Sequence, residues 1–276
     1  MLAVILQKFD PYTQLVDGIQ QAVQELPDLG LRIEHYSVDC VSPNEQLRIL
    51  SHMKRRKTIA GILISPLADP EIVASINDLV DLDIPVLTIH SDLPDSRRFC
   101  FIGQDGEEVG RLAAEQVAHA TQGHGEVAVL MPSSNLQNAN GRRLGFESVL
   151  QAHYPGLILV QTVEISEQEL SAYRATLTLL KQHRSLSALF VACGNAGEVG
   201  QAVRSLYLQG QVKIVCVDVY PEIIDQIRDG VIDCAIDQNL RQQGFLAMKT
   251  LVNRITGQFP ETIGEMVPPP VVYRTH

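Results

Sequence analysis

Two adjacent arginines, Arg142 and Arg143, stand in the stretch NANGRRLGF, shortly before Phe146. The pattern predicts a helix over residues 138–152, with an apolar stripe that includes Phe146. Arg142 lies four residues before Phe146 on that stripe, whereas Arg143 is turned by about 100° and faces solvent. An inward guanidinium needs acceptors, because an unpaired buried charge is very costly. Either an acid of the fold or the hydroxyls of a ligand could supply them.

Polar residues also follow several strand-like apolar runs in both halves of the chain. In open α/β sheets, ligands bind beyond the carboxyl ends of the strands, so such positions are binding candidates. A single polar residue there is more often a helix cap or a turn former, but the recurrence favours binding. The candidates are Phe9, Tyr12, His90, Asp92, Asn195, Asp218 and Gln238. Asp218 is the acid that we expect to orient Arg142, with both facing a ligand cleft between two lobes.

The common catalytic motifs GxSxG, HExxH, GxGxxG and the P-loop do not occur in the sequence. SHMK (residues 51–54) matches SxxK formally, but it falls in a helical stripe and lacks the partner motifs. GNAGEVG (residues 194–200) could cradle a phosphate or simply make a tight turn from strand to helix. The eight histidines show no metal-ligand spacing. We therefore expect a binding protein rather than an enzyme, with no cofactor and no metal.

Short apolar runs alternate with helical patterns along the whole chain. The runs are nearly continuous, as in parallel strands that are buried on both faces, and the alternation predicts an α/β fold. Roughly five strand–helix units precede Phe101 and about as many follow it, which favours two similar open-sheet, Rossmann-like lobes. The runs are LAVIL, AGILIS, IPVLTIH, EVAVLM, SALFVA and VKIVCVD.

The predicted N-terminal lobe comprises residues 1–103 and 239–265, and the C-terminal lobe comprises residues 104–238 and 266–276. The chain would then cross between the lobes near residues 103–105, 237–239 and 265–268. Each of these places joins a strand-like run to a polar or proline-rich turn. Three crossings form a three-strand hinge, about which the lobes could close on a ligand.

Charge and cysteine content narrow the function classes. The net charge of −10 makes this chain a poor nucleic-acid binder, because binding to phosphates needs a basic surface. No apolar run reaches the ~18 residues that a membrane span needs, and no signal-peptide pattern begins the chain. The five cysteines are odd in number and contain no CxxC, so we expect buried free thiols and a reducing, cytoplasmic compartment, unless a leader was removed.

Several stretches together resemble the type I periplasmic-binding-protein superfamily and, within it, the effector domains of LacI/GalR-family repressors. The resemblance runs along nearly the whole chain and implies the two-lobed fold described above. The stretches that carry it are DPYTQLVDGIQQAV, IAGILISP, DIPVLTIHSDLPDSRRFCFIGQDGEEVGRLAAE, NGRRLGFESVL, VKIVCVDVYPEIIDQIRDGVIDCAIDQ and PVVYRTH.

The resemblance also implies roles for single residues. The arginine of the family's R-x-x-G-F motif, which binds sugar hydroxyls, falls on Arg142, in agreement with the helix-stripe argument. The acid at the end of a late strand falls on Asp218, and the glutamine of a later crossover falls on Gln238.

Three further positions match the family less closely. His90 stands where the family usually has an acid, with Asp92 two residues on, and this departure puts a standard pentose or hexose in doubt. The family's aromatic residue after the first strand falls on Phe9 or Tyr12. Asn195 lies where the family often has Asn or Asp.

The resemblance implies two alternative functions. In the first, the chain is the cytoplasmic effector-sensing domain of a transcriptional regulator, in which a small sugar-like ligand shifts hinge closure and dimer geometry. DNA would be bound only through a helix-turn-helix domain that this chain lacks. In the second, it is the periplasmic receptor of a sugar ABC transporter. The cysteines and the stretch SDLPDSRR favour the regulator, for which no membrane partner is expected.

A regulator of this kind also implies a homodimer. The segment from Pro70 to Leu82 and the stretch SDLPDSRR are the expected interface. The apolar residues of that segment exceed what one sheet-facing stripe needs, so the surplus packs either on a neighbouring helix or on a partner chain. These residues are Ile72, Val73, Ile76, Leu79, Val80 and Leu82.

Overall fold

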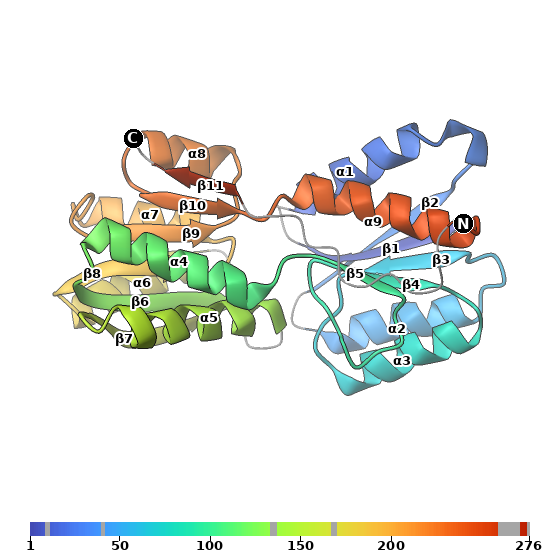
Figure 1. The fold of residues 1–276 in the computed structure, drawn as a ribbon, viewed down its shortest axis with the longest axis horizontal. Coiled ribbons are helices and arrows are strands. Elements are labelled where there is room, and N and C mark those ends of the chain that lie inside the picture. The colour runs from blue at the N-terminus through green and yellow to red at the C-terminus, as the bar shows by residue number, and fades with distance from the viewer. Residues whose placement is uncertain (9–11, 40–41, 133–136, 167–169, 259–270, 275–276) are drawn as a thin grey trace. The chain divides into compact units, whose positions relative to one another are not determined.

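The computed structural model describes the chain apart from residues 9–11, 40–41, 133–136, 167–169, 259–270 and 275–276 (Figure 1). It consists of two compact units: Met1–Gln104 with Asn239–Pro269, and Asp105–Gln238 with Pro270–His276. Below, they are called the first and the second unit. The expected α/β fold with two parallel-sheet lobes is confirmed. Phe9, Cys40 and the crossing expected at residues 265–268 lie outside the described residues.

The first unit is a five-stranded sheet with the strand order β2-β1-β3-β4-β5, in which every pair of neighbours is parallel. Helices α1 and α9 cover one face, and α2 and α3 cover the other (Figure 1). The strands are β1 (Leu2–Gln7), β2 (Ile33–Val38), β3 (Gly61–Ile64), β4 (Val86–Ile89) and β5 (Cys100–Ile102). The helices are α1 (Tyr12–Gln24), the short 3-10 helix η1 (Pro27–Leu29), α2 (Pro43–Lys54), α3 (Pro70–Asp81) and α9 (Leu240–Ile255).

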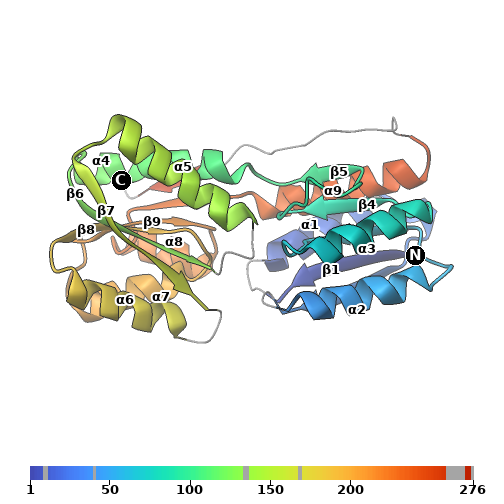
Figure 2. The ribbon, with the colours of Figure 1, turned by 90° about the horizontal axis from the view of Figure 1, so that it is seen from below.

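The second unit is a six-stranded sheet with the order β11-β10-β9-β8-β6-β7. Its neighbours are parallel except β11, which runs antiparallel to β10. Helices α4 and α5 lie on one face, and α6 and α7 on the other (Figure 2). The strands are β6 (Gly125–Pro132), β7 (Leu157–Ile165), β8 (Leu186–Val191), β9 (Lys213–Val217), β10 (Cys234–Asp237) and β11 (Val271–Arg274). The helices are α4 (Gly106–Thr121), α5 (Gln137–His153), α6 (Ser171–Gln182), α7 (Ala196–Ser205) and α8 (Pro221–Arg228).

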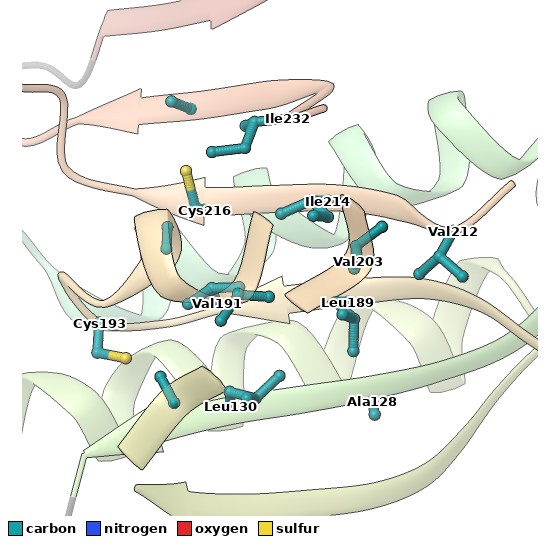
Figure 3. Close-up of a cluster of buried hydrophobic side chains, with 14 of the residues drawn as sticks. Ala128, Leu130, Leu189, Val191, Cys193, Val203, Val212, Ile214, Cys216 and Ile232 are labelled. Carbon is teal, nitrogen blue, oxygen red and sulfur yellow. The ribbon is translucent and has the colours of Figure 1, made fainter. Parts of the chain in front are cut away.

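The continuous apolar runs are central strands whose alternate side chains enter two different cores. On β8, Leu189 and Val191 join the cluster beneath α6, α7 and α8, whereas Phe190 joins the cluster beneath α4 and α5. Figure 3 shows Leu189 and Val191 in the first of these clusters, together with Ile214 and Cys216 of β9. Because successive strand residues point to opposite faces, a strand with two covered faces needs an apolar residue at almost every position.

The cysteines take part in these cores. Cys100, Cys193, Cys216 and Cys234 are free and buried, as expected. Burial raises the pKa of the Cys193 thiol to about 12 and that of Cys100 to about 11, so both stay protonated near neutral pH. Each therefore behaves as a small apolar side chain.

None of the helices in the described segments combines the length and the apolar character that crossing a bilayer demands.

Candidate functional site

Three neighbouring strands of the second unit end at one edge of its sheet. The residues that directly follow β8, β9 and β10 are Ala192, Asp218 and Gln238. Because these strands are parallel neighbours, their carboxyl ends meet at the same edge. The side chains of Gln238 and Asp218 consequently touch: Nε2 of Gln238 donates a hydrogen bond to Oδ1 of Asp218 at 2.5 Å.

Arg142 reaches this edge from α5. Its side chain is buried, with the residue only 4% exposed. Nη1 donates to the carbonyl oxygen of Ala192 at 3.0 Å, and Nη2 donates to Oε1 of Gln238. The Gln238 amide thus lies between the guanidinium and the Asp218 carboxylate and bonds to both.

The environment of Asp218 is electrostatically unusual. Burial raises the pKa of its carboxyl above the ordinary value, while the positive charge of Arg142 and the hydrogen bond from Gln238 act in the opposite direction. Its backbone also has a positive φ of 71°, a region that few residues other than Gly, Asn and Asp occupy. A strained backbone and a desolvated acid in one residue are typical of functional positions.

Arg143 differs from Arg142 as the helix pattern predicts. Its guanidinium pairs with Glu147 one turn later, at 2.9 Å, and the Arg143 side chain is 29% exposed. It is therefore turned away from the strand ends, although it is half-buried rather than fully in solvent. On the inner stripe, Phe146 stacks on Phe190 of β8 with ring centroids 4.8 Å apart.

Asn195 is not joined to this cluster by a side-chain hydrogen bond within the described residues. It is the half-buried residue before α7, and its side chain does not cap the helix. It does lie on the same strand end as Ala192, three residues further along the chain.

In the first unit, the structure brings Tyr12 and His90 together. Tyr12 begins α1 and His90 follows β4; the Tyr12 hydroxyl and Nδ1 of His90 are 2.8 Å apart, and the rings pack edge to face at 5.0 Å. Both residues are buried, and His90 has a positive φ of 64°. These two expected candidates therefore form a polar pair at the carboxyl edge of the first sheet.

Asp92, the other candidate of the first unit, is engaged in the fold. It forms an ion pair with Arg98, in which each side chain is 12% exposed, and accepts a hydrogen bond from Oγ1 of Thr88 at 2.6 Å. The Asp92 carboxylate is therefore already ion-paired within the first unit.

A buried polar group at the same edge of the first sheet was not singled out from the sequence. Nε2 of Gln7 and Nε2 of Gln46 both donate to the carbonyl oxygen of Ser65, each at 2.8 Å. Gln7 ends β1 and Ser65 follows β3. The signal was available, since a glutamine and a serine directly follow fully apolar strand sequences.

Chemically, the second-unit cluster offers charged donors and a carboxylate acceptor side by side. This combination suits a ligand with neighbouring hydroxyls, each of which both donates and accepts hydrogen bonds. Within the described residues, there is no group of three His, Cys, Asp or Glu side chains that could hold a metal ion.

The family model described as a periplasmic binding protein domain matches residues 2–259. The chain belongs to this family. The D-ribose/D-allose-binding protein of Pseudomonas aeruginosa is 24% identical over 261 residues, which is 91% of this chain and 80% of that protein.

Two solved structures show the same fold. GanP, a glucose-galactose binding protein from Geobacillus stearothermophilus, has a TM-score of 0.88 and 26% identity, covering 99% of this chain and 97% of its own. The sugar-binding protein of a sugar ABC transporter from Bacillus halodurans has a TM-score of 0.87 and 24% identity, covering 100% of this chain and 98% of its own.

These similarities correct the functional expectation. The relatives of this periplasmic binding protein are named as sugar-binding proteins, so the prediction of a LacI-type effector domain that controls DNA binding is wrong. The error arose because the two-lobed core and the R-x-x-G-F motif do not separate regulators from receptors.

The expected cytoplasmic location is wrong for the same reason, since the family is that of periplasmic binding proteins. The prediction relied on free cysteines as a sign of a reducing compartment. Thiols that are buried and protonated are shielded from oxidants, so they carry no information about the compartment.

Proposed function

We propose that this protein is the sugar-binding receptor of an ABC transporter and works outside the cytoplasm. The names of its relatives support this, since they bind ribose and allose or glucose and galactose, and one serves a sugar ABC transporter. Membership of a family of binding proteins also favours binding over catalysis.

The observation that carries the proposal is the cluster of Arg142, Gln238 and Asp218. Among the described residues, Gln238 alone donates a side-chain hydrogen bond to the Asp218 carboxylate. A carboxylate has about four acceptor positions, so Asp218 retains capacity for sugar hydroxyls. Arg142 is fixed by two acceptors and presents a charge that strengthens further hydrogen bonds. Asn195 is a further proposed contact, since it lies on the same strand end.

For the first unit, we propose Tyr12 and His90 as sugar contacts. A histidine in place of the acid changes what this position offers, because a neutral imidazole presents one donor and one acceptor, whereas a carboxylate only accepts. The preferred sugar should therefore differ from that of receptors with an acid here.

A thermal-shift screen followed by calorimetric titration tests the proposal. The protein is mixed with D-ribose, D-allose, D-glucose, D-galactose and D-arabinose, with phosphorylated sugars and nucleosides as comparison ligands. A true ligand at 100 times its Kd should add about 2.7 kcal/mol to the free energy of unfolding. If only the comparison ligands bind, or none does, the proposal of a neutral-sugar receptor fails. His90→Ala should weaken binding of the sugar found.

A further inference from the structure

Helices α4 and α5 of the second unit touch through glycines, backbone against backbone. A Cβ atom placed on Gly110 would lie 2.0 Å from the carbonyl oxygen of Arg142. In the reciprocal direction, a Cβ on Gly145 would lie 2.0 Å from the carbonyl oxygen of Glu107. Real Cβ atoms do not approach a backbone oxygen to less than about 3 Å, so the helices can be this close only because both positions are glycine.

The first unit contains a matching contact between α1 and α9. A Cβ on Gly18 would lie 1.9 Å from the carbonyl oxygen of Arg241, and one on Gly244 would lie 2.1 Å from that of Leu15. The two units therefore use the same reciprocal glycine packing. The second unit differs in one respect: the carbonyl that Gly110 meets belongs to Arg142, a residue of the Arg142–Gln238–Asp218 cluster.

The amide nitrogen and the carbonyl oxygen of Arg142 both lie close to glycines of α4. A Cβ on Gly106 would lie 3.3 Å from the Arg142 amide nitrogen and 2.7 Å from the carbonyl oxygen of Asn138. On its other side, α5 is held on the sheet by the stack of Phe146 on Phe190. The helix is thus held by both the sheet and α4, and Arg142 lies at one of the two closest contacts with α4.

From this geometry we propose that Gly110 is a positioning residue for the sugar site, acting through the backbone of Arg142. The inference rests on the proposed function of Arg142 as a sugar contact. A methyl group at position 110 would force α5 away from α4 by about 1 Å at this point. The bond from Nη1 of Arg142 to Ala192, at 3.0 Å, would then exceed the usual range for an N–H···O hydrogen bond.

The test compares Gly110→Ala with two controls by calorimetric titration with D-ribose, D-allose, D-glucose and D-galactose. Gly110→Ala should weaken binding about tenfold or more. Gly156→Ala places its methyl 2.6 Å from the backbone carbonyl oxygen of Gly123, at the amino-terminal edge of the second sheet, and should change affinity less than about threefold. Gly197→Ala, whose added methyl first meets the carboxylate end of the Glu222 side chain rather than backbone, should also keep wild-type affinity.

A double-mutant cycle separates positioning from general damage, since only coupled residues are non-additive. In an Arg142→Ala background, Gly110→Ala should have little further effect on sugar affinity. Additive losses, or equal losses for Gly110→Ala and Gly156→Ala, would overturn the inference. If Gly110→Ala does not fold, Gly106→Ala replaces it, because its added methyl makes a milder contact next to the same arginine.

A second readout does not depend on sugar. The Nε–Hε resonance of Arg142 in a nitrogen-15 NMR spectrum is assigned by its loss in Arg142→Ala. It should shift in Gly110→Ala and stay in place in Gly156→Ala. An unmoved resonance contradicts the positioning role even if the proposed function holds, whereas a shifted resonance in a protein that binds none of the four sugars contradicts the proposed function alone.

Discussion

At the scale of single residues, the site shows how a buried charge is compensated through an intermediary. Arg142 gives its hydrogen bonds to a carbonyl and to an amide, and only the amide bonds to the acid. Gln238 can do this because its amide group both accepts and donates. The arrangement satisfies Arg142 without occupying the whole carboxylate of Asp218.

We predict that Arg142→Ala weakens sugar binding by about one to two orders of magnitude, because charge-assisted hydrogen bonds contribute roughly 1.5–3 kcal/mol each. Arg143→Ala should be nearly neutral, since that side chain pairs with Glu147 on the partly exposed side of the helix. Titration calorimetry on both variants gives the comparison. Equal losses would show that Arg142 has no special role.

Asp218→Asn should raise the melting temperature at pH 7 while lowering sugar affinity about tenfold, because neutral hydrogen bonds are weaker than charged ones. The Asp218 pKa is raised by burial, so its ionised form is disfavoured in the folded state. The free energy of unfolding therefore falls as pH rises from the ordinary pKa of 3.8 through the raised value. Asparagine removes this cost, tolerates the positive φ of 71° and still accepts from Gln238.

The gain in melting temperature should shrink as pH falls toward 4, because the pH then approaches the ordinary pKa of 3.8 and protonation of Asp218 removes the cost of its buried charge. Asp225→Asn is the matched control, because that side chain is 72% exposed. Calorimetric scans of the three proteins between pH 4 and pH 7.5 measure the trend. A constant difference across this range would contradict the assignment of the effect to Asp218.

The sequence predicted some residues of the site and could not predict others. The sequence could place Arg142 and Arg143 on different faces of the helix, because the rotation of 100° from one residue to the next follows from local helix geometry. The bridge through Gln238 depends on two strands aligning across 20 residues of chain, and the ion pair of Asp92 with Arg98 depends on how a turn folds back. Such tertiary contacts leave no local pattern.

At the scale of elements, the sequence reveals the central strands more clearly than the edge strands. The six apolar runs correspond to β1, β3, β4, β6, β8 and β9, all of them central. β2 and β7 are edge strands with mostly half-exposed residues, and polar residues interrupt both sequences, Glu34 and His35 in β2 and Gln161 and Thr162 in β7. β11 was expected from PVVYRTH, but its antiparallel direction was not, because strand composition does not encode direction.

Asp105 caps α4, the helix that packs against α5. Its Oδ1 accepts hydrogen bonds from the backbone amides of Glu107 at 2.8 Å and Glu108 at 3.4 Å. Asp105→Ala should therefore lower the stability of this helix by about 1 kcal/mol, whereas Asp105→Asn should retain most of it. Hydrogen exchange of α4 amides measures the change directly.

Asp95→Ala is the control for this cap, since Asp95 is exposed in a turn and its side chain caps none of the described helices. It should leave exchange in α4 unchanged. Equal protection in Asp105→Ala and the wild-type protein would mean that packing against α5, rather than the cap, holds the helix start.

At the scale of the whole molecule, the helix that was expected at a dimer interface, α3, buries much of its apolar surface within its own unit. In α3, Ile72, Ile76 and Leu79 are fully buried within the first unit, where α2 packs beside the helix. Val73 and Val80 are half-buried, so Leu82, at 53% exposure, is the main apolar residue of that segment left in solvent. Much of the apolar surface of α3 that suggested a partner chain is therefore covered within the first unit.

We therefore predict a monomer at micromolar concentration, with and without sugar. The exposed large apolar residues of the described segments are scattered over many elements, and isolated apolar residues do not make an interface. A net charge of −10 adds repulsion between copies, which salt screens. Light scattering at 20 and 150 mM salt should give the mass of one chain at both. If a dimer appears, Leu82→Arg distinguishes its surface, because that substitution disrupts an interface built on α3 and leaves any other intact.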